Sequence, residues 1–134
     1  MKLATLIARI QTLRPSQYDE QQLTEWVNEV EAQVVETILN RANGNNIQLE
    51  PYDIAVDAEK ELLVPDENCD LYLHYLAAKI DYWNAELDRY NNDVAMYSAS
   101  WQTFASKYRR THIPKVDFPP IPEVLWPDVL RSEP

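Results

Sequence analysis

The 134-residue chain contains a single glycine, Gly44, and this scarcity restricts its fold more than any other feature. Glycine readily adopts positive φ, so β-hairpin turns, phosphate-binding loops and dinucleotide-binding fingerprints depend on it. Helices have no such need. Because 46% of the residues are hydrophobic, the chain can also bury a core. We therefore expect one mostly helical domain.

Two helices are expected in the first forty residues, because apolar side chains recur there at steps of three and four. The first helix stops at Pro15, and its apolar face comprises Leu3, Leu6, Ile7, Ile10 and Leu13. The second begins after a cap at Ser16 or Asp19, and its apolar face comprises Leu23, Trp26, Val27, Val30, Val34 and Ile38. The side chains of this second helix that are expected to face water are Glu25, Glu29, Glu31 and Glu36.

The segment from residue 45 to residue 66, after the second helix, has no sustained pattern. The sequence Asn43-Gly44-Asn45 is a strong helix stop. The apolar runs that follow alternate only briefly before Pro65. We expect an extended connection here, with a short strand or one helical turn, packed over the helices.

The segment from residue 67 to residue 110 carries the longest apolar pattern. Steps of three and four connect Leu73, Leu76, Ile80, Trp83, Leu87, Tyr90, Val94, Tyr97, Trp101, Phe104 and Tyr108. One helix of about 43 residues would be about 65 Å long, too long for a domain of this size. Asn91, Asn92 and Asp93 are poor helix formers that favour turns. We therefore expect two antiparallel helices, 67–90 and 92–110, with the turn at these residues and with aromatic stripes that face each other and the first two helices.

The composition changes abruptly after residue 112. Six of the nine prolines lie at positions 114, 119, 120, 122, 127 and 134, which favours an extended, polyproline-like arm. The arm carries many apolar residues, so it should lie along its own domain or reach a neighbour. The expected fold is all-α. It is a small bundle of about four helices (residues 1–112), the last two an antiparallel hairpin, with an extended Pro-rich C-terminal arm (residues 113–134).

Residues that could serve a metal site or catalysis are present, but they form no recognised motif. Asp70 and His74 are four residues apart on one expected helix face and could share a ligand. The favoured interpretation is a capping acid and a partly buried histidine. Cys69 is the only cysteine, so the chain can form no internal disulfide. A position near a helix N-terminus would lower the pKa of the Cys69 thiol. Cys69 paired with His74 or His112 could then suggest nucleophilic catalysis. Paired carboxylates could serve in acid–base catalysis, but a solvated surface is the favoured interpretation for Glu59, Glu61, Asp81, Glu86 and Asp88. We expect no catalysis, no cofactor and no metal.

The remaining candidates are an aromatic stripe and a basic run, for which the favoured interpretations are, respectively, core with subunit interface and capping of the last helix. The aromatic stripe within residues 75–108 is interpreted as core and subunit interface rather than as a platform for stacking bases. The basic side chains near residue 110 can cap the last helix or meet an acidic partner. The predicted interface residues are Lys107, Arg109, Arg110, Phe118, Ile121, Leu125 and Trp126.

The net charge is −10, from 22 acidic and 12 basic residues. Such a charge supports solubility and opposes binding to nucleic acid. The first 15 residues contain Lys2, Arg9 and Arg14 and lack the continuous apolar core of a signal peptide. We expect a soluble protein that is neither exported nor bound to a membrane.

Two blocks of the sequence, from Leu13 to Val34 and from Leu62 to Lys115, carry a family resemblance. Their most specific stretches are LLVPDENCDLYLHYLAAKIDYWNAELDRYNND and YRRTHIPK. These blocks resemble small proteins of phages and prophages of Gram-positive bacteria. They look like the head–tail connector (head completion or adaptor) group of long-tailed phages, which has no catalytic motif. The Pro-rich arm departs from the family pattern, so the resemblance assigns it no role.

The resemblance implies a virion structural protein. Such connectors form a ring, commonly twelve-fold, between the portal of the filled head and the tail. The implied partners are the portal protein and tail-side or neighbouring connector subunits, and DNA passes through the ring without specific binding. The implied locations are the host cytoplasm during assembly and the head–tail junction of the virion. The chain would be a homo-oligomer there, although isolated connectors can be monomers.

A function of a different class stays open on the sequence. The chain could be a non-enzymatic adaptor or regulatory module that binds a protein partner through its arm. Polyproline segments are ligands of this kind.

Overall fold

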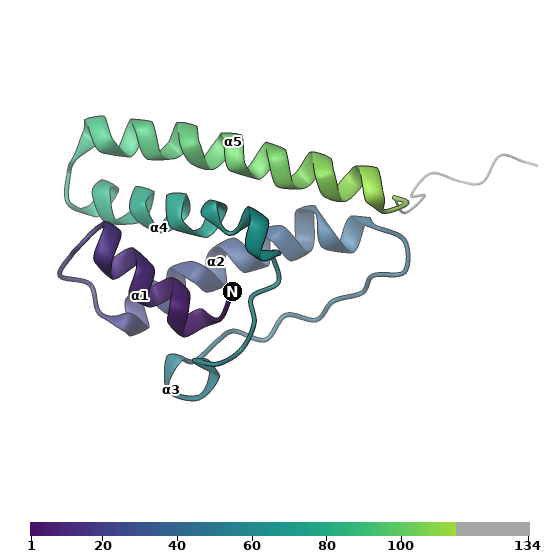
Figure 1. Cartoon of the computed structure of the whole chain (residues 1–134), viewed down its shortest axis with the longest axis horizontal. Coiled ribbons are helices and arrows are strands. Elements are labelled where there is room, and N and C mark those ends of the chain that lie inside the picture. The colour runs from purple at the N-terminus through teal and green to yellow at the C-terminus, as the bar shows by residue number, and fades with distance from the viewer. Residues whose placement is uncertain (115–134) are drawn as a thin grey trace, which may run out of the picture.

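The computed structural model describes residues 1–114, which form five α-helices and two 3₁₀ turns. No β-strand occurs in this range, and two isolated bridges pair Lys2 with Glu61 and Ala42 with Pro114. In Figure 1, α5 lies along one side of α4, while α1 and α2 lie on the other side. The predicted all-α class is confirmed over these residues, and most of the predicted arm lies outside them.

The first two helices, α1 (Leu3–Leu13) and α2 (Glu20–Thr37), form where the apolar spacing predicts them. Asp19 caps α2, because its carboxylate accepts a hydrogen bond from the N–H of Gln22 (2.8 Å). The predicted apolar faces of both helices are buried except for Leu13, which is 62% exposed. The prediction that Glu31 faces water is wrong, because this side chain is fully buried.

The connection between α2 and α4 is mostly extended and contains one short helix, α3 (Ile54–Asp57), as predicted. It begins with the 3₁₀ turn η1 (Leu39–Arg41) and ends with a second one, η2 (Asp66–Asn68). Asn28 of α2 fixes its middle part. The side-chain amide of Asn28 donates to the carbonyl of Tyr52 (3.1 Å) and accepts from the Tyr52 N–H (2.8 Å).

The last two helices, α4 (Asp70–Trp83) and α5 (Leu87–Thr111), form an antiparallel hairpin (Figure 1). The hairpin is confirmed, but its predicted turn is wrong. The chain reverses at residues 84–86, where Ala85 has a φ of 58°. Residues 91–93 lie inside α5.

Tertiary contacts explain the position of this turn. Asn84 Oδ1 accepts hydrogen bonds from Gln17 Nε2 (2.7 Å) and from the Tyr18 hydroxyl (3.3 Å), which ties the turn to the loop between α1 and α2. Asp93 is buried and lies 3.3 Å from the Arg14 guanidinium. The helix propensities of asparagine and aspartate are below that of alanine by less than about 1 kcal/mol per residue. Such contacts can outweigh that preference.

The apolar stripe of α5 is only partly covered. Within residues 1–114, Phe104 is the one large apolar side chain of α5 that is buried. Trp83 and Leu87, which flank the turn, are 61% and 64% exposed. The predicted stripes therefore do not all face inward, and the prediction is wrong near the turn. The reason is that α5 packs mainly against α4, and no helix of residues 1–114 lies on its outer side.

Candidate functional site: an aromatic groove and an exposed apolar end

The predicted basic interface residues lie in the last two turns of α5. Lys107 forms an ion pair with Glu67 of η2, so its charge is compensated within the chain. Arg109 and Arg110 are exposed in the last turn, where the helix end favours cations. Counted over residues 1–114, neither arginine has an ion-pair partner. Within the described range, Arg109 and Arg110 therefore carry positive charges without an acidic partner, whereas Lys107 does not.

The end of α5 is held against the start of the connection. Asn45 Nδ2 donates to the Tyr108 hydroxyl (2.6 Å), and the His112 ring stacks on the Tyr108 ring with centroids 3.7 Å apart. The Asn43 N–H donates to the carbonyl of Ile113 (2.6 Å). The chain thus leaves α5 beside the end of α2. The predicted interface residues that follow lie outside the described residues, namely Phe118, Ile121, Leu125 and Trp126.

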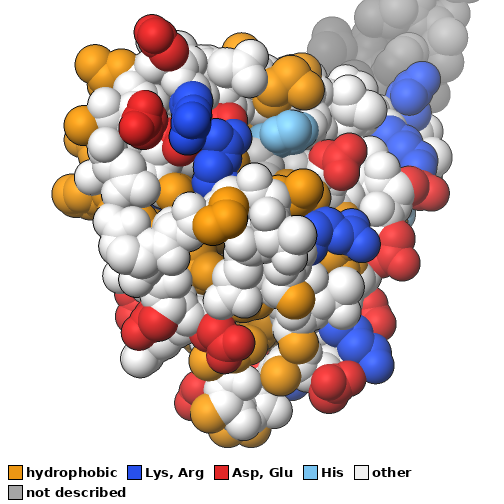
Figure 2. Space-filling model, turned by 60° about the vertical axis from the view of Figure 1, so that its left-hand side comes forward, with side chains coloured by type: hydrophobic (Ala, Val, Ile, Leu, Met, Phe, Trp, Pro, Cys, Tyr) orange, Lys and Arg blue, Asp and Glu red, His pale blue; other side chains and the backbone are white. Residues whose placement is uncertain are grey.

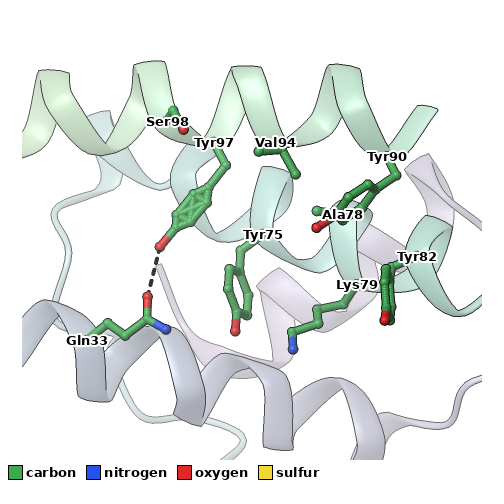
Figure 3. A pocket seen from close by; sticks show the side chains of 9 residues that line it. All are labelled: Gln33, Tyr75, Ala78, Lys79, Tyr82, Tyr90, Val94, Tyr97 and Ser98. Atoms are coloured by element: carbon green, nitrogen blue, oxygen red, sulfur yellow. Dashed lines mark hydrogen bonds between the residues drawn. The ribbon is translucent and has the colours of Figure 1, made fainter. Parts of the chain in front are cut away.

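A groove with aromatic walls lies between α4 and α5 and reaches α2. Helical spacing places Tyr75 and Tyr82 two turns apart on α4, and Tyr90 and Tyr97 two turns apart on α5. The hairpin brings the pairs together, with centroids 5.2 Å apart for Tyr75 and Tyr97 and 5.4 Å apart for Tyr82 and Tyr90. Figure 3 shows these side chains between the helices. The groove has a volume of about 610 Å³ and is lined by Gln33, Tyr75, Ala78, Lys79, Tyr82, Tyr90, Val94, Tyr97 and Ser98.

Polar contacts to α2 hold the rings of this groove in place. The Tyr97 hydroxyl donates to Gln33 Oε1 (3.3 Å; Figure 3), and the Tyr75 hydroxyl donates to Glu29 Oε2 (2.8 Å). Lys79 Nζ lies 3.2 Å from Glu29 Oε2 and 5.6 Å from the centroid of the Tyr75 ring. Burial raises the pKa of Tyr97 to about 12, so this hydroxyl keeps its proton at neutral pH. Apolar walls with a polar rim are typical of protein-binding sites.

A second surface lies at the end of the molecule where α1 ends and the hairpin turns. Three large apolar side chains are exposed there, and we call them the hairpin-end patch: Leu13, Trp83 and Leu87. The bond from Gln17 to Asn84 keeps the α1–α2 loop beside the turn. Figure 2 turns this end of the molecule forward and shows orange side chains among charged ones. Burying such side chains would contribute about 1.5–3 kcal/mol each.

Two buried carboxylates and an arginine join α1 to both helices of the hairpin. The Arg14 guanidinium is 3.2 Å from Asp81 of α4 and 3.3 Å from Asp93 of α5. Burial, and then the neighbouring Asp81 carboxyl group, raise the pKa of Asp93 to about 7. The prediction that Asp81 belongs to the solvated surface is wrong, whereas it is confirmed for Glu59, Glu61, Glu86 and Asp88.

Sequence reasoning missed Arg14 and Asp93 as partners. They are 79 positions apart, and no local pattern connects them. Each had an interpretation of its own, Arg14 as a charge in the N-terminal segment and Asp93 as part of a turn. Only the packing of α1 against the hairpin brings them together.

A second buried polar cluster joins α2, α4 and the connection. The Tyr72 hydroxyl donates to Glu31 Oε1 and accepts from the Val64 N–H (3.1 Å). Glu31 Oε1 also accepts from the Leu63 N–H (3.2 Å), and burial raises the Glu31 pKa. The cluster is closed to solvent, so its role is to fix residues 63 and 64 against the helices.

Cys69 is placed as a structural residue rather than as a nucleophile. It is buried, and its Sγ–H donates to the carbonyls of Val64 (3.4 Å) and Pro65 (3.3 Å). Burial raises the pKa of the thiol to about 11, opposite to the lowering that a helix N-terminus would give. Among residues 1–114, His, Cys, Asp and Glu side chains form no group of three or more that could hold a metal ion.

Comparisons with known proteins do not suggest a function for the surfaces described above. No protein-family model, no curated protein and no solved structure matches the chain. Over the part of the chain that the structure describes, no helix is long and apolar enough to span a membrane. The features that suggest a function are therefore the aromatic groove, the hairpin-end patch and the basic end of α5.

Proposed function

We propose that the chain is a head–tail connector of a tailed phage or prophage of a Gram-positive host. It assembles as a ring on the portal protein and joins the DNA-filled head to the tail. Its partners are the portal, neighbouring copies of the chain and tail-side components, and its action is binding rather than catalysis. It is located in the host cytoplasm during assembly and then at the head–tail junction. The proposal rests on the resemblance of residues 13–34 and 62–115.

The hairpin-end patch is the structural observation that supports this proposal. Leu13, Trp83 and Leu87 expose large apolar surfaces at one end of the bundle. Large apolar side chains exposed at one end of a molecule are candidates for protein contacts. Tryptophan is also enriched among the residues that contribute most to binding energy. A subunit that is covered at this end by a portal or a neighbour would gain from burying all three side chains.

The two ends of α5 differ in chemistry, and this difference suits a ring. The hairpin-end patch lies at its start, and Arg109 and Arg110 lie at its end. A helix of this length separates them by about 37 Å. Head-to-tail contacts between two different surfaces close into a ring when the rotation permits. The net charge of −10 also suits a ring through which DNA passes, because an acidic protein surface repels the DNA phosphates.

The experiment mixes the purified chain with the portal protein encoded in the same genome. Binding is measured by co-sedimentation, and stoichiometry is measured by native mass spectrometry. The wild-type chain should bind as a ring. Trp83→Asp and Leu87→Asp should each weaken binding about tenfold, the equivalent of about 1.4 kcal/mol. Val56→Asp is the matched control, because Val56 is 79% exposed on α3 and should tolerate the change.

Two outcomes would count against the connector role. If the wild-type chain binds neither portal nor tail components, the proposal fails. Deletion of residues 113–134 separates the connector from an adaptor. An adaptor would lose its partner on this deletion while virion assembly stays unchanged.

A further inference from the structure

We propose that the aromatic groove is the binding site for this chain's own Pro-rich segment, residues 115–128, which folds back onto the same molecule. The proposal assigns a ligand to the groove and does not depend on the connector role. Four observations carry it: the chemistry of the groove, the composition of the segment, the place where the described chain ends, and the lengths involved.

The groove has the chemistry of a polyproline-binding surface. Its walls are tyrosine rings, which are held in position by the ring contacts and by the bonds to α2 described above. Aromatic-lined grooves bind Pro-rich segments because prolyl rings pack on flat aromatic faces. A polyproline helix is also ordered before it binds, so little conformational entropy is lost. Figure 3 shows the tyrosines spaced along the two helices rather than gathered around one point, which suits an extended ligand.

The segment supplies a matching ligand. It contains Pro119-Pro120, then Pro122 and Pro127, and its apolar side chains include Phe118, Ile121, Leu125 and Trp126. These side chains need cover from water, which would contribute about 1.5–3 kcal/mol for each one fully buried. The groove offers apolar area that residues 1–114 leave uncovered, including Val94, which is 40% exposed.

The described chain ends beside the start of the connection that follows α2. Pro114 pairs with Ala42, and Ile113 accepts the bond from Asn43, so the chain leaves α5 next to the residues that follow α2. Gln33 of α2 forms one wall of the groove. The segment therefore begins beside the residues that follow α2, the helix that also contacts Tyr97 through Gln33.

The lengths agree as well. From the end of α5, Tyr97 and Tyr90 lie about 21 and 32 Å back along the helix at about 1.5 Å per residue. A polyproline segment advances about 3.1 Å per residue, so the ten residues 119–128 would cover about 31 Å counted back from residue 118. The proposal requires the chain to reverse within residues 115–118, which precede Pro119 and include Asp117, a residue type that favours turns. A tether this short gives the molecule's own segment a high effective concentration, so it competes well against other copies.

Paramagnetic relaxation measurements on the full chain test the proposal. A nitroxide is attached at Ala95→Cys, an exposed position beside Val94. The native Cys69 is buried with a raised pKa and reacts slowly. The amide signals of residues 118–126 are then compared with those of a sample that carries a diamagnetic label. We expect these signals to lose most of their intensity.

Matched substitutions and a mixed sample complete the experiment. Val94→Asp should restore the signals, whereas Met96→Asp should not, because Met96 is equally exposed (45%) but does not line this groove. In a mixture of ¹⁵N-labelled chain without nitroxide and unlabelled chain with nitroxide, the signals should keep their intensity. If the signals of residues 118–126 keep their intensity in the sample in which every chain carries the nitroxide, the proposal is overturned. Intensity that is lost in the mixture would overturn it too, because the segment would then bind a second copy.

Discussion

The Arg14 guanidinium lies 3.2 Å from the buried carboxylate of Asp81, and this pair connects the end of α1 to the α4–α5 hairpin. The same guanidinium lies 3.3 Å from Asp93 on the other helix of the hairpin. One cation thus faces two carboxylates that are withdrawn from water. The arrangement fixes the hairpin relative to the first helix, and it makes stability depend on charge at this point.

Arg14→Met is expected to destabilise the fold strongly. Removing one partner leaves the other charges buried without compensation, which costs several kcal/mol when the site is dry. Because Arg14 is partly exposed, we expect a loss of roughly 2–4 kcal/mol in the free energy of unfolding. Urea denaturation at neutral pH measures it. The control Arg9→Met changes an exposed arginine on the same helix and should cost less than about 0.5 kcal/mol. Equal effects of the two substitutions would contradict the assignment.

Asp93→Asn is expected to flatten the pH dependence of stability. The pKa of Asp93 in the fold is about 7, above the ordinary value of 3.8, so the folded state binds this proton more tightly than the unfolded state does. The stabilisation is complete below about pH 4 and is lost as the pH rises to about 7, a change of roughly 2–4 kcal/mol. Denaturant titrations at pH 4, 5.5, 7 and 8 measure the slope. Asp88→Asn, an exposed change on the same helix, should leave the slope as in the wild type.

Tyr72→Phe tests the buried cluster between α2 and the connection. The change removes the hydroxyl that donates to Glu31 and accepts from the Val64 N–H, so both groups lose a partner. We expect a cost of about 1–3 kcal/mol in the free energy of unfolding, measured by thermal and urea denaturation. Tyr75→Phe removes a hydroxyl bonded to Glu29 in an exposed pair, and it should cost at most about 0.5 kcal/mol. A smaller loss for Tyr72→Phe than for Tyr75→Phe would refute the structural role.

Ala85→Gly is expected to stabilise the hairpin turn. Ala85 adopts a φ of 58°, which disfavours a side chain and costs about 1 kcal/mol, and glycine removes this strain. Because glycine also adds freedom to the unfolded chain, the net gain should be about 0.5 kcal/mol. Ala99→Gly lies in the exposed middle of α5 and should instead cost about 1 kcal/mol. A gain in the free energy of unfolding for Ala85→Gly and a loss for Ala99→Gly, in the same denaturation assay, would support the turn at residues 84–86. A loss for both variants would contradict it.

The sequence by itself determined the local elements whose pattern is periodic. The apolar faces of α1 and α2 were predictable from steps of three and four, because a helix with such a face is stable only when that face is buried. The stop at Pro15, the cap at Asp19 and the helical turn in the connection follow from the same local chemistry. The existence of the last hairpin followed from length alone, because one straight helix would have outgrown the domain.

The tertiary structure alone decided where that hairpin turns and which polar residues are buried. Asn84 is in the turn because Gln17 and Tyr18 bind its side chain, and Asp93 stays helical while it pairs with Arg14. Glu31 is buried because Tyr72 and the connection supply its partners. Such contacts join residues far apart in the chain. Their contribution to stability outweighs differences in helix propensity, which are less than about 1 kcal/mol per residue. Within residues 1–114 the same packing covers only one side of α5, and the aromatic groove is open for that reason.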